Sequence, residues 1–404
     1  MPAITCVEDF RRLYRRRVPR MFRDYAEAGS YTESTLHRNE ADLRRIAIRQ
    51  RVGRDVGAVD TATRIGGEAA ALPVAFAPVG MLGLQHAAGE IVVAQAAEAF
   101  GVPFILSTMS ICSLEDVAAA TARPFGFQLY VVKDRGFVRD LIHRAKAAGC
   151  SQLVVTMDLP VLGQRHRDVK NGLSIRPGPR HALGIAAKPG WAWRMLRSRH
   201  RSFGNVVGHA KGVDDLESLL VWAAESVDPS LSWADVEWIA GEWGGPVMVK
   251  GILDAEDARI AADLGVSAIV VSNHGGRQLD GATSPIAALP AIAEAIEGRV
   301  ELLMDSGVRT GADILRASAL GASSVLLGRS MVYALGAMGR AGIDRLLDLL
   351  QAELRVAMAL AGRTEIAALE PSDVAVPADM AASVAGTAGA APPAGLHRPV
   401  IEGA

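Results

Sequence analysis

The chain has 404 residues, half of them apolar, and a formal net charge of -1 at pH 7. This length and apolar content can bury one barrel-sized core or two smaller ones. A nearly neutral chain has no global electrostatic reason to bind nucleic acid, so no such partner is expected. The three cysteines, Cys6, Cys112 and Cys150, are too few and too widely spaced for a disulfide framework or a zinc cluster. We therefore expect a cytoplasmic protein without a metal.

The first 30 residues are rich in arginine but lack the continuous apolar segment of a signal peptide. The longest apolar run, residues 69–84, contains two prolines and is shorter than the roughly 20 residues that a membrane-spanning helix requires. We predict neither secretion nor a transmembrane segment. Helical spacing over residues 7–27 and 40–50 predicts an N-terminal helical cap.

After this cap, short apolar runs alternate with alanine-rich amphipathic segments that end near glycine. Eight runs occur, at residues 73–78, 103–107, 125–130, 153–158, 247–251, 268–273, 301–307 and 324–329. Most are spaced by roughly 20 to 35 residues, which is room for one helix and two loops. Eight such units in order predict an α/β fold of the (β/α)8 barrel type. An open doubly wound sheet is the alternative, but no GxGxxG follows the first run.

One interval, from Asp158 to Val247, is too long for a single crossover and predicts an insertion after the fourth strand. Within it, residues 169–213 contain nine Lys or Arg residues and no Asp or Glu, together with Trp191, Trp193 and Phe203. A basic stretch with interleaved aromatics predicts peripheral contact with the anionic inner face of the cell membrane. A lid over the active site is the competing interpretation.

The C-terminal residues differ in composition from the rest of the chain. Beyond Ser372 the sequence is rich in Ala, Gly and Pro and has little periodicity. We predict one domain over residues 1–372, which includes the basic insertion at 169–213, and a tail over residues 373–404. The tail is expected to be disordered from 377 to 404.

Polar residues at the carboxyl ends of the barrel strands should form the functional site. The segment IVVSNHGGRQLD, residues 269–280, ends an apolar run in an imidazole and a guanidinium three residues apart on a glycine turn. His274 and Arg277 make a plausible proton acceptor beside an anion clamp, although a strand followed by a solvated turn would also have this pattern. The other strand ends present Ala77, Pro78, Ser107, Gln128, Tyr130, Thr156, Asp158, Lys250, Ser272, Asp305, Gly307, Arg309, Gly328 and Arg329.

The last two strand ends differ from the others. Gly307 and Gly328 would let backbone N-H groups approach an anion, and Arg309 and Arg329 supply forked donors, as in the phosphate site that barrels often build there. A phosphorylated cofactor or substrate is therefore expected. The middle strands would supply the chemistry, with Lys250 as a fixed positive charge and His274 as the base. Arg165 and Arg277 would then bind a carboxylate, and Asp158 would orient the imidazole.

Several segments resemble the FMN-dependent 2-hydroxy acid dehydrogenase and oxidase family. They are SNHGGRQLD (272–280), FQLYVVKDR (127–135), DLPVLGQRHRDVKNG (158–172), VKGI (249–252) and DSGVRTGADI (305–314), within a match from about residue 10 to 372. AGSYTESTLHRN (28–39), LSTMSICSLEDV (106–117) and WAW (191–193) are most similar to the bacterial respiratory L-lactate dehydrogenases of that family. The resemblance implies oxidation of an L-2-hydroxy acid, L-lactate to pyruvate, with electrons passed to a quinone or another respiratory acceptor.

The resemblance also implies a role for each matching residue. His274 would be the base, paired with Asp158. Arg165 and Arg277 would bind the substrate carboxylate, with Tyr25 and Tyr130 bonded to its carboxylate and hydroxyl. Lys250 would lie at the N1 and O2 edge of the flavin. The remaining FMN contacts would be Ala77, Pro78, Val79, Ser107, Gln128, Thr156, Ser272, Asp305, Gly307, Arg309, Gly328 and Arg329.

Substrate and acceptor remain open at this point. Met109 stands where the glycolate oxidase pattern has Trp, so the wall facing the substrate side chain differs from that enzyme. A methyl group fits, and a larger acid such as mandelate is an alternative. An oxygen-using oxidase would share every motif. A different FMN barrel would have no reason to keep Arg165, His274 and Arg277 together, and a catalytically inactive binding protein would not need the intact ionisable set. The resemblance further implies a homo-oligomer, a tetramer.

Overall fold

The structure is a computed structural model that describes residues 3–171, 178–213, 218, 222 and 225–380. Its centre is an eight-stranded parallel sheet with the order β4-β11-β10-β9-β8-β7-β6-β5. The strands are β4 (Val74–Phe76), β5 (Ile105–Ser107), β6 (Gly126–Leu129), β7 (Gln152–Thr156), β8 (Val247–Ile252), β9 (Ala268–Val271), β10 (Glu301–Met304) and β11 (Ser324–Leu327). Each lies within, or within one residue of, one of the eight predicted apolar runs, and the predicted (β/α)8 barrel is confirmed.

The sheet closes on itself through residues at its two edges. A parallel bridge joins Phe76 to Phe104, and the Phe76 N-H donates to the carbonyl of Pro103 at 2.9 Å. The strands are apolar along nearly their whole length because both faces are buried, one toward the barrel axis and one toward the helices.

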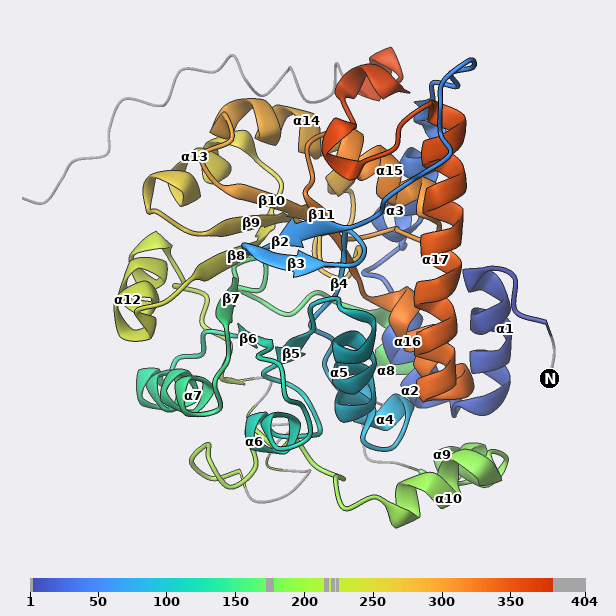
Figure 1. The fold of residues 1–404 in the computed structure, drawn as a ribbon. Helices are drawn as coiled ribbons and strands as arrows, with labels where there is room; N and C mark the ends of the chain where they lie inside the picture. The colour runs from blue at the N-terminus through green and yellow to red at the C-terminus, as the bar shows by residue number, and fades with distance from the viewer. Residues whose placement is uncertain (1–2, 172–177, 214–217, 219–221, 223–224, 381–404) are drawn as a thin grey trace, which may run out of the picture.

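Helices surround the barrel, and Figure 1 shows the long α17 running along one side. They are α4 (Leu82–Gln85), α5 (Gly89–Phe100), α6 (Leu114–Ala118), α7 (Arg135–Ala147), α12 (Trp233–Trp243), α13 (Ala255–Asp263), α14 (Pro285–Ile296), α15 (Gly311–Ala319), α16 (Arg329–Met338) and α17 (Arg340–Ala361). Two 3-10 turns follow α17, η1 (Ile366–Ala368) and η2 (Pro371–Asp373). No described helix is both long enough and apolar enough to cross a membrane.

A hairpin closes the amino-terminal end of the barrel. Its strands β2 (Thr63–Ile65) and β3 (Glu68–Ala70) lie across the barrel in Figure 1. Ile65 and Ala70 pack against the cluster that fills the barrel, which includes Val154, Met248 and Leu303. With this end filled, a ligand site of the barrel must lie at the opposite end, where the strands finish.

The N-terminal cap is helical, as predicted, but its elements differ from the predicted ones. Residues 7–27 form two helices, α1 (Val7–Arg17) and α2 (Arg20–Glu27), because Pro19 disfavours helical backbone at Val18, whose φ is -101° and ψ is 138°. The third helix, α3 (Ser34–Arg45), begins and ends earlier than the predicted 40–50. Residues 47–48 instead form β1 (Ala47–Ile48).

The predicted tail begins too early. The strand β12 (Val374–Ala375) pairs with β1, and Asp373 is buried, so the ordered domain extends past residue 372. The side chain of Met380 is also buried. Residues 381–404, where most of the predicted disorder falls, lie outside the described residues.

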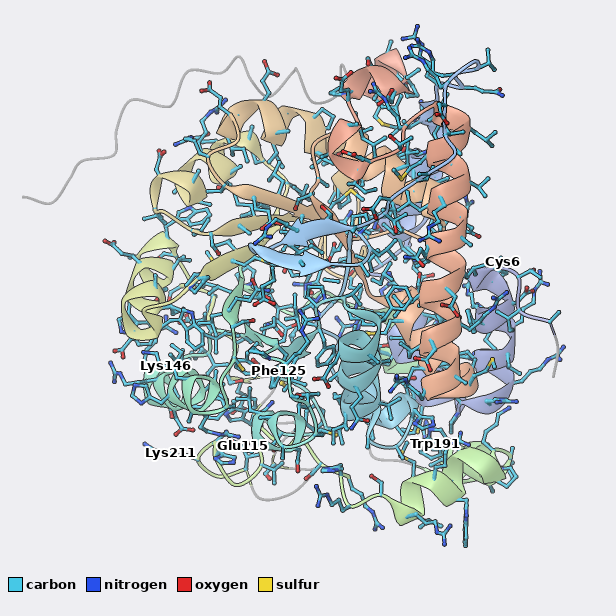
Figure 2. All side chains as sticks on the ribbon, in the orientation of Figure 1. Cys6, Glu115, Phe125, Lys146, Trp191 and Lys211 are labelled. Carbon is cyan, nitrogen blue, oxygen red and sulfur yellow. The ribbon has the colours of Figure 1, made fainter. Side chains whose placement is uncertain are left out.

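The long insertion after β7 contains α8 (His166–Asn171), α9 (Pro179–Ala186) and α10 (Pro189–Arg197). Trp191 and Phe203 were predicted to enter a membrane, and this is wrong, because both are buried in the protein. Trp191 stacks on Phe22 and donates its indole N-H to the carbonyl of Leu84, where α10 meets the body of the protein (Figure 2). Trp193 is 59% exposed, as the prediction requires.

Candidate active site

A cavity of about 300 Å³ opens at the carboxyl ends of the barrel strands. Among the residues predicted from the sequence, its walls contain Tyr25, Ala77, Pro78, Val79, Met109, Gln128, Tyr130, Thr156, Arg165, Lys250, His274, Arg277, Asp305, Gly307, Arg309, Gly328 and Arg329. They come from every strand end and from the helical cap. The barrel therefore brings together side chains that lie up to about 300 positions apart in the sequence.

Three predicted residues lie behind this wall, each bonded to a residue that lines it. The Ser107 hydroxyl donates to Gln128 Oε1 at 2.9 Å, and Lys250 Nζ donates to the Ser272 hydroxyl at 2.8 Å. Asp158 Oδ1 lies 2.9 Å from His274 Nδ1. These three residues thus orient wall residues and do not face the cavity.

His274 is held in one orientation by its neighbours. Its backbone is left-handed, with φ at 56°, and its N-H donates to the Ser272 hydroxyl at 3.0 Å. The Asp158 carboxylate accepts from Nδ1, so Nε2 is the ring nitrogen available to the cavity. Burial of Asp158 opposes ionisation, but the charges of His274 and Lys250 outweigh it and lower the pKa of this carboxyl. The pair therefore favours an ionised aspartate beside the imidazole.

A glycine in β8 makes room for this pair. Gly251 has a φ of 107°, and a Cβ there would lie 2.6 Å from the Asp158 side chain. The register between β8 and β9 shifts between Lys250 and Ile252, which is a local bulge of the kind that re-aims a side chain at a functional site. The local backbone thus accommodates Asp158 beside the strand end that carries Lys250.

Lys250 is a buried cation, with 4% of its surface exposed. Its ammonium lies 3.0 Å from Asp305 Oδ2. Burial alone would lower the pKa of Lys250, but the carboxylates of Asp305 and Asp158 outweigh it and raise this pKa. The cavity wall therefore carries a positive charge that persists throughout the neutral pH range.

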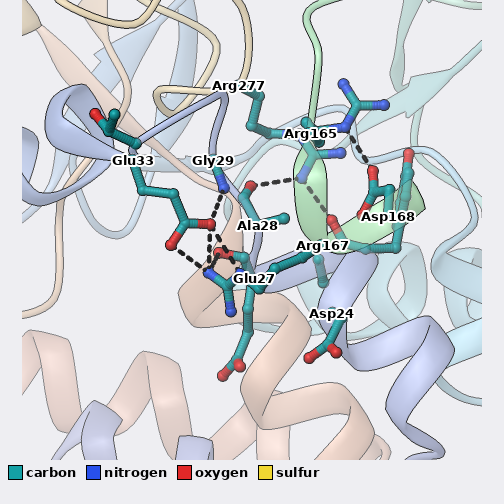
Figure 3. A network of polar contacts seen from close by, with 12 residues as sticks. Asp24, Glu27, Ala28, Gly29, Glu33, Arg165, Arg167, Asp168 and Arg277 are labelled. Carbon is teal, nitrogen blue, oxygen red and sulfur yellow. Dashed lines mark hydrogen bonds and ion pairs between the residues drawn. The ribbon is translucent and has the colours of Figure 1, made fainter. Parts of the chain in front are cut away.

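Two guanidiniums, from Arg165 and Arg277, lie near each other at one side of the cavity (Figure 3). Arg277 donates to the carbonyls of Tyr25 and Ala28 and lies 4.8 Å from the Tyr25 ring centroid. Arg165 pairs with Asp168 at 2.6 Å. Burial and the charge of Arg165 lower the pKa of Arg277, which forms no ion pair with a carboxylate of the described residues. An anion bound here would compensate that charge.

A second pair of guanidiniums lies at the ends of β10 and β11. Arg309 pairs with Glu40 at 2.9 Å, whereas Arg329 donates to the carbonyls of Ala26, Ala28 and Gly275. Burial, reinforced by Arg277 and Arg309, lowers the pKa of Arg329 to about 10. In the part of the chain that the structure describes, Arg329 also has no ion-paired carboxylate. This is a second place where an anionic group would be stabilised.

Gly307 has a further structural role besides the predicted one. Its φ is 98°, and a Cβ there would lie 2.5 Å from the carbonyl oxygen of Asn39. The glycine is therefore required where α3 packs on the strand end, and it also lines the cavity.

Comparison with known proteins identifies the family. The profile of the family described as FMN-dependent dehydrogenase matches residues 14–376. The chain belongs to the FMN-dependent dehydrogenase family. FMN is accordingly the cofactor of this dehydrogenase, which acts on 2-hydroxy acids, as the sequence motifs had indicated.

Related proteins align with nearly the whole length of the dehydrogenase. An L-lactate dehydrogenase of Caulobacter vibrioides is 49% identical over 92% of this chain and 98% of its own length. One of Actinobacillus pleuropneumoniae is 50% identical over 90% and 96%, respectively. Among solved structures, the monotopic membrane protein (S)-mandelate dehydrogenase aligns with a TM-score of 0.88 at 32% identity, covering 93% of this chain and all of its own. A mandelate oxidase aligns with a TM-score of 0.79 at 38% identity, covering 92% and 98%.

The donor set of the dehydrogenase's cavity fits FMN. Arg309, Arg329 and the backbone at Gly307 are suited to a single phosphate. Farther along the wall, the buried cation of Lys250 and the carboxamide of Gln128, which donates to Thr156 at 3.0 Å, are suited to the polar edge of a flat ring. Arg329, which has no carboxylate partner among the described residues, is the observation that calls for an anionic ligand at this end.

Sequence reasoning missed other residues that line the cavity of the dehydrogenase. They are Ala26, Gly80, Met81, Thr108, Val132, Leu159, Leu162, Trp222, Ser226, Val227, Gly275, Ser306, Val308, Leu326 and Val332. Several had a signal: Thr108 follows β5 directly, and Leu159 and Leu162 lie within the motif at 158–172. Trp222 and Val227 had none, because their place depends on how the insertion returns to the barrel. That return is visible in the bridge between Val132 and Val227.

Proposed function

We propose that this FMN-dependent dehydrogenase oxidises L-lactate to pyruvate. The observation that carries the proposal is the convergence of an aspartate-paired imidazole and two partly buried guanidiniums on one cavity. The curated relatives support the choice of substrate, because proteins named L-lactate dehydrogenase are 48–50% identical to the chain. The mandelate enzymes are only 32–38% identical.

The substrate carboxylate is assigned to Arg277 and Arg165. Arg277 is the stronger candidate, since its charge has no carboxylate partner among the described residues and its pKa is lowered by burial and by Arg165. Tyr25 and Tyr130 line the same cavity and would donate to the carboxylate and the hydroxyl. Burial raises the pKa of Tyr130, so its phenol stays protonated and able to donate.

Oxidation of a 2-hydroxy acid to a 2-oxo acid removes two electrons and two protons from the substrate. FMN, when bound, would accept the two electrons together with one of the protons. We assign one proton to Nε2 of His274, with Asp158 holding the other ring nitrogen and stabilising the imidazolium. Lys250 keeps a fixed positive charge on the wall assigned to the flavin's N1 and O2 edge.

We keep the remaining cofactor contacts that the sequence predicted as part of this proposal. Ala77, Pro78, Val79, Gln128, Thr156, Asp305, Gly307, Gly328 and the two phosphate-end arginines line the cavity, while Ser107 and Ser272 brace wall residues. Asp305 would act through its ion pair with Lys250. We infer direct FMN contact for the first group and a positioning role for the two serines.

Two alternatives concern substrate size and the acceptor. Met109 lines the cavity and is assigned to the wall facing the substrate side chain, where a flexible thioether could admit a group larger than methyl. Structural similarity to mandelate oxidases favours oxygen as the alternative acceptor. Steady peroxide production under air would identify an oxidase.

We further propose a quinone or another respiratory acceptor, reached by peripheral attachment to the inner face of the membrane. The insertion supports this through α9 and α10, on which Leu183, Trp193 and Leu196 are 73%, 59% and 66% exposed. Arg197 lies 4.8 Å from the Trp193 ring, which places a cation beside that apolar surface. A solved structure of similar fold is described as a monotopic membrane protein. We also propose a homo-oligomer, a tetramer, whose mass sedimentation would measure.

Anaerobic flavin bleaching tests the proposed reaction. The purified protein should carry FMN. L-lactate should reduce it and D-lactate should not, because residues that fix the carboxylate and the hydroxyl leave the α-hydrogen of only one enantiomer correctly placed. A panel of larger 2-hydroxy acids would show whether lactate is preferred. Equal reduction rates with both lactate enantiomers, or extraction of FAD, would contradict the proposal.

A further inference from the structure

The loop between β5 and α6, residues 108–113, forms one wall of the substrate cavity. Thr108 and Met109 line the cavity, and the Met109 carbonyl accepts the backbone N-H of Met81, another lining residue, at 2.8 Å. A Cβ placed on Gly80 would lie 3.2 Å from both Met109 Cβ and the Tyr25 hydroxyl. Met109 is therefore close to a group assigned to substrate binding, and a shift of this loop would change the space available to the substrate.

The side chain of Asn205, at the far end of the basic insertion, bridges the two ends of this loop. Asn205 is fully buried. Its Oδ1 accepts the N-H of Leu114 at 2.9 Å, and its Nδ2 donates to the Ser110 hydroxyl at 2.9 Å. The same Nδ2 lies 3.4 Å and 3.5 Å from the carbonyls of Ser107 and Thr108. One carboxamide thus contacts the loop before, within and after its cavity-lining residues.

This arrangement requires both a donor and an acceptor. The Ser110 hydroxyl donates to the carbonyl of Cys112 at 2.7 Å, so it must accept from Asn205. Only an amide nitrogen can face this hydroxyl and the two carbonyls, and only an oxygen can face the Leu114 N-H. An aspartate of the same shape would place a carboxylate oxygen against acceptors, which is repulsive in a buried site.

The backbone around Asn205 is packed just as closely against the loop. A Cβ on Gly204 would lie 2.6 Å from the Ser113 nitrogen, so only glycine permits this approach. Phe203 and Val206 on either side are buried. Arg144 of α7 donates to the Asn205 carbonyl at 3.2 Å and pairs with Glu115, which is labelled on α6 in Figure 2. Residues 203–206 thus pack the insertion closely against the barrel.

We propose that Asn205 is a positioning residue that sets the size of substrate the enzyme accepts, by holding the 108–113 loop and hence Met109. The insertion of residues 159–246 then contributes to the substrate site twice, since Arg165 near its start is assigned to the carboxylate and Asn205, after α10, holds the loop that carries Met109. On the other side of the loop, Glu90 accepts the N-H groups of Gly83 and Ile111 at 2.8 and 2.9 Å. Met109 itself donates its N-H to the Ser107 hydroxyl at 3.2 Å, so Asn205 acts on Met109 through its two neighbours, Thr108 and Ser110. The inference rests on the proposed 2-hydroxy acid oxidation.

The test compares Asn205→Asp with the parent holoenzyme. Anaerobic flavin reduction is measured with L-lactate and with the bulkier L-2-hydroxybutyrate, together with hydrogen exchange of the segment 107–118. We expect a higher KM for L-lactate, a ratio of kcat/KM values (L-lactate over L-2-hydroxybutyrate) lowered by about fivefold or more, and faster exchange in that segment alone. If Asn205→Asp fails to fold, Ser110→Ala removes the receiving hydroxyl while keeping Asn205 and should shift the ratio in the same direction.

A matched control is Ser323→Ala, which removes hydrogen bonds to Glu301 and Leu302 near the amino-terminal end of the barrel. It should lower the melting temperature and leave the substrate ratio unchanged. If Asn205→Asp lowers stability but keeps the ratio within twofold of the parent, its role is only structural and the inference is overturned. If none of the 2-hydroxy acids tested reduces the flavin of the parent enzyme, the proposed function fails instead. Unchanged hydrogen exchange of the segment 107–118 in Asn205→Asp would separately reject the positioning role.

Discussion

The barrel end and the insertion of residues 159–246 contribute to the same cavity in different ways. At the barrel end, Lys250 pairs with Asp305 at 3.0 Å and His274 pairs with Asp158 at 2.9 Å. The insertion contacts the cavity near its ends, while its middle presents exposed apolar side chains on α9 and α10. The closed barrel thus carries the groups assigned to the reaction. The insertion contributes further residues to the cavity wall and an exposed apolar surface.

The strongest test of this division concerns the barrel end. His274→Gln should lower the rate of flavin reduction by L-lactate by about 10²- to 10⁴-fold, the usual loss on removing a general base. FMN content should stay normal, because His274 is assigned to the substrate and glutamine has a similar reach. Stopped-flow reduction together with a cofactor assay measures both. A rate close to that of the parent would mean that another residue accepts the proton.

The barrel end was predictable from the sequence because it follows a local rule. Each strand is a short apolar run, and in a parallel barrel the residues that directly follow such runs gather at one end, where the site forms. Asp158, Lys250 and His274 could therefore be grouped before their contacts were known. The residue types around them are also constrained locally. Position 251, for example, must be glycine, because a Cβ there would clash with Asp158.

The insertion was less predictable because its residues find partners far along the chain. Composition correctly marked 169–213 as basic, but it could not show that Trp191 is covered by Phe22 and Leu84, or that Phe203 is buried. Asn205 gave no signal, since an asparagine before two valines is typical of many loops. Its role depends on hydrogen bonds to residues more than 90 positions away.

The two arginines assigned to the substrate carboxylate allow a direct comparison of the regions. Arg277 follows a barrel strand and has no carboxylate partner among the described residues, whereas Arg165 belongs to the insertion and already pairs with Asp168. Arg277→Lys should lower kcat/KM for L-lactate by about 10- to 100-fold, because a lysine cannot reproduce the forked donor. Arg165→Lys should have a smaller effect. An equal or larger loss at Arg165 would mean that the insertion, and not the barrel, dominates carboxylate binding.

The smallest expected effect concerns the exposed surface of the insertion. If α10 docks on an anionic membrane, Arg197→Gln combined with Trp193→Ser should weaken binding to vesicles containing phosphatidylglycerol by roughly tenfold. Each cation near such a surface contributes on the order of 1 kcal/mol, and the tryptophan adds shallow apolar insertion. Binding should also fall with salt, since the attraction is screened within about 10 Å at 0.1 M ionic strength.

The matched control for this surface is Arg355→Gln combined with Leu360→Ser, which removes the same kinds of exposed side chain from α17. This control should bind vesicles like the parent, and both double variants should keep the parent rate of flavin reduction by L-lactate. Quinone reduction on vesicles should slow only in the α10 variant. A parent enzyme that does not bind vesicles at low salt would end the membrane proposal. If the α10 variant instead slows flavin reduction in free solution, the insertion acts as a lid, because the affected step then needs no membrane.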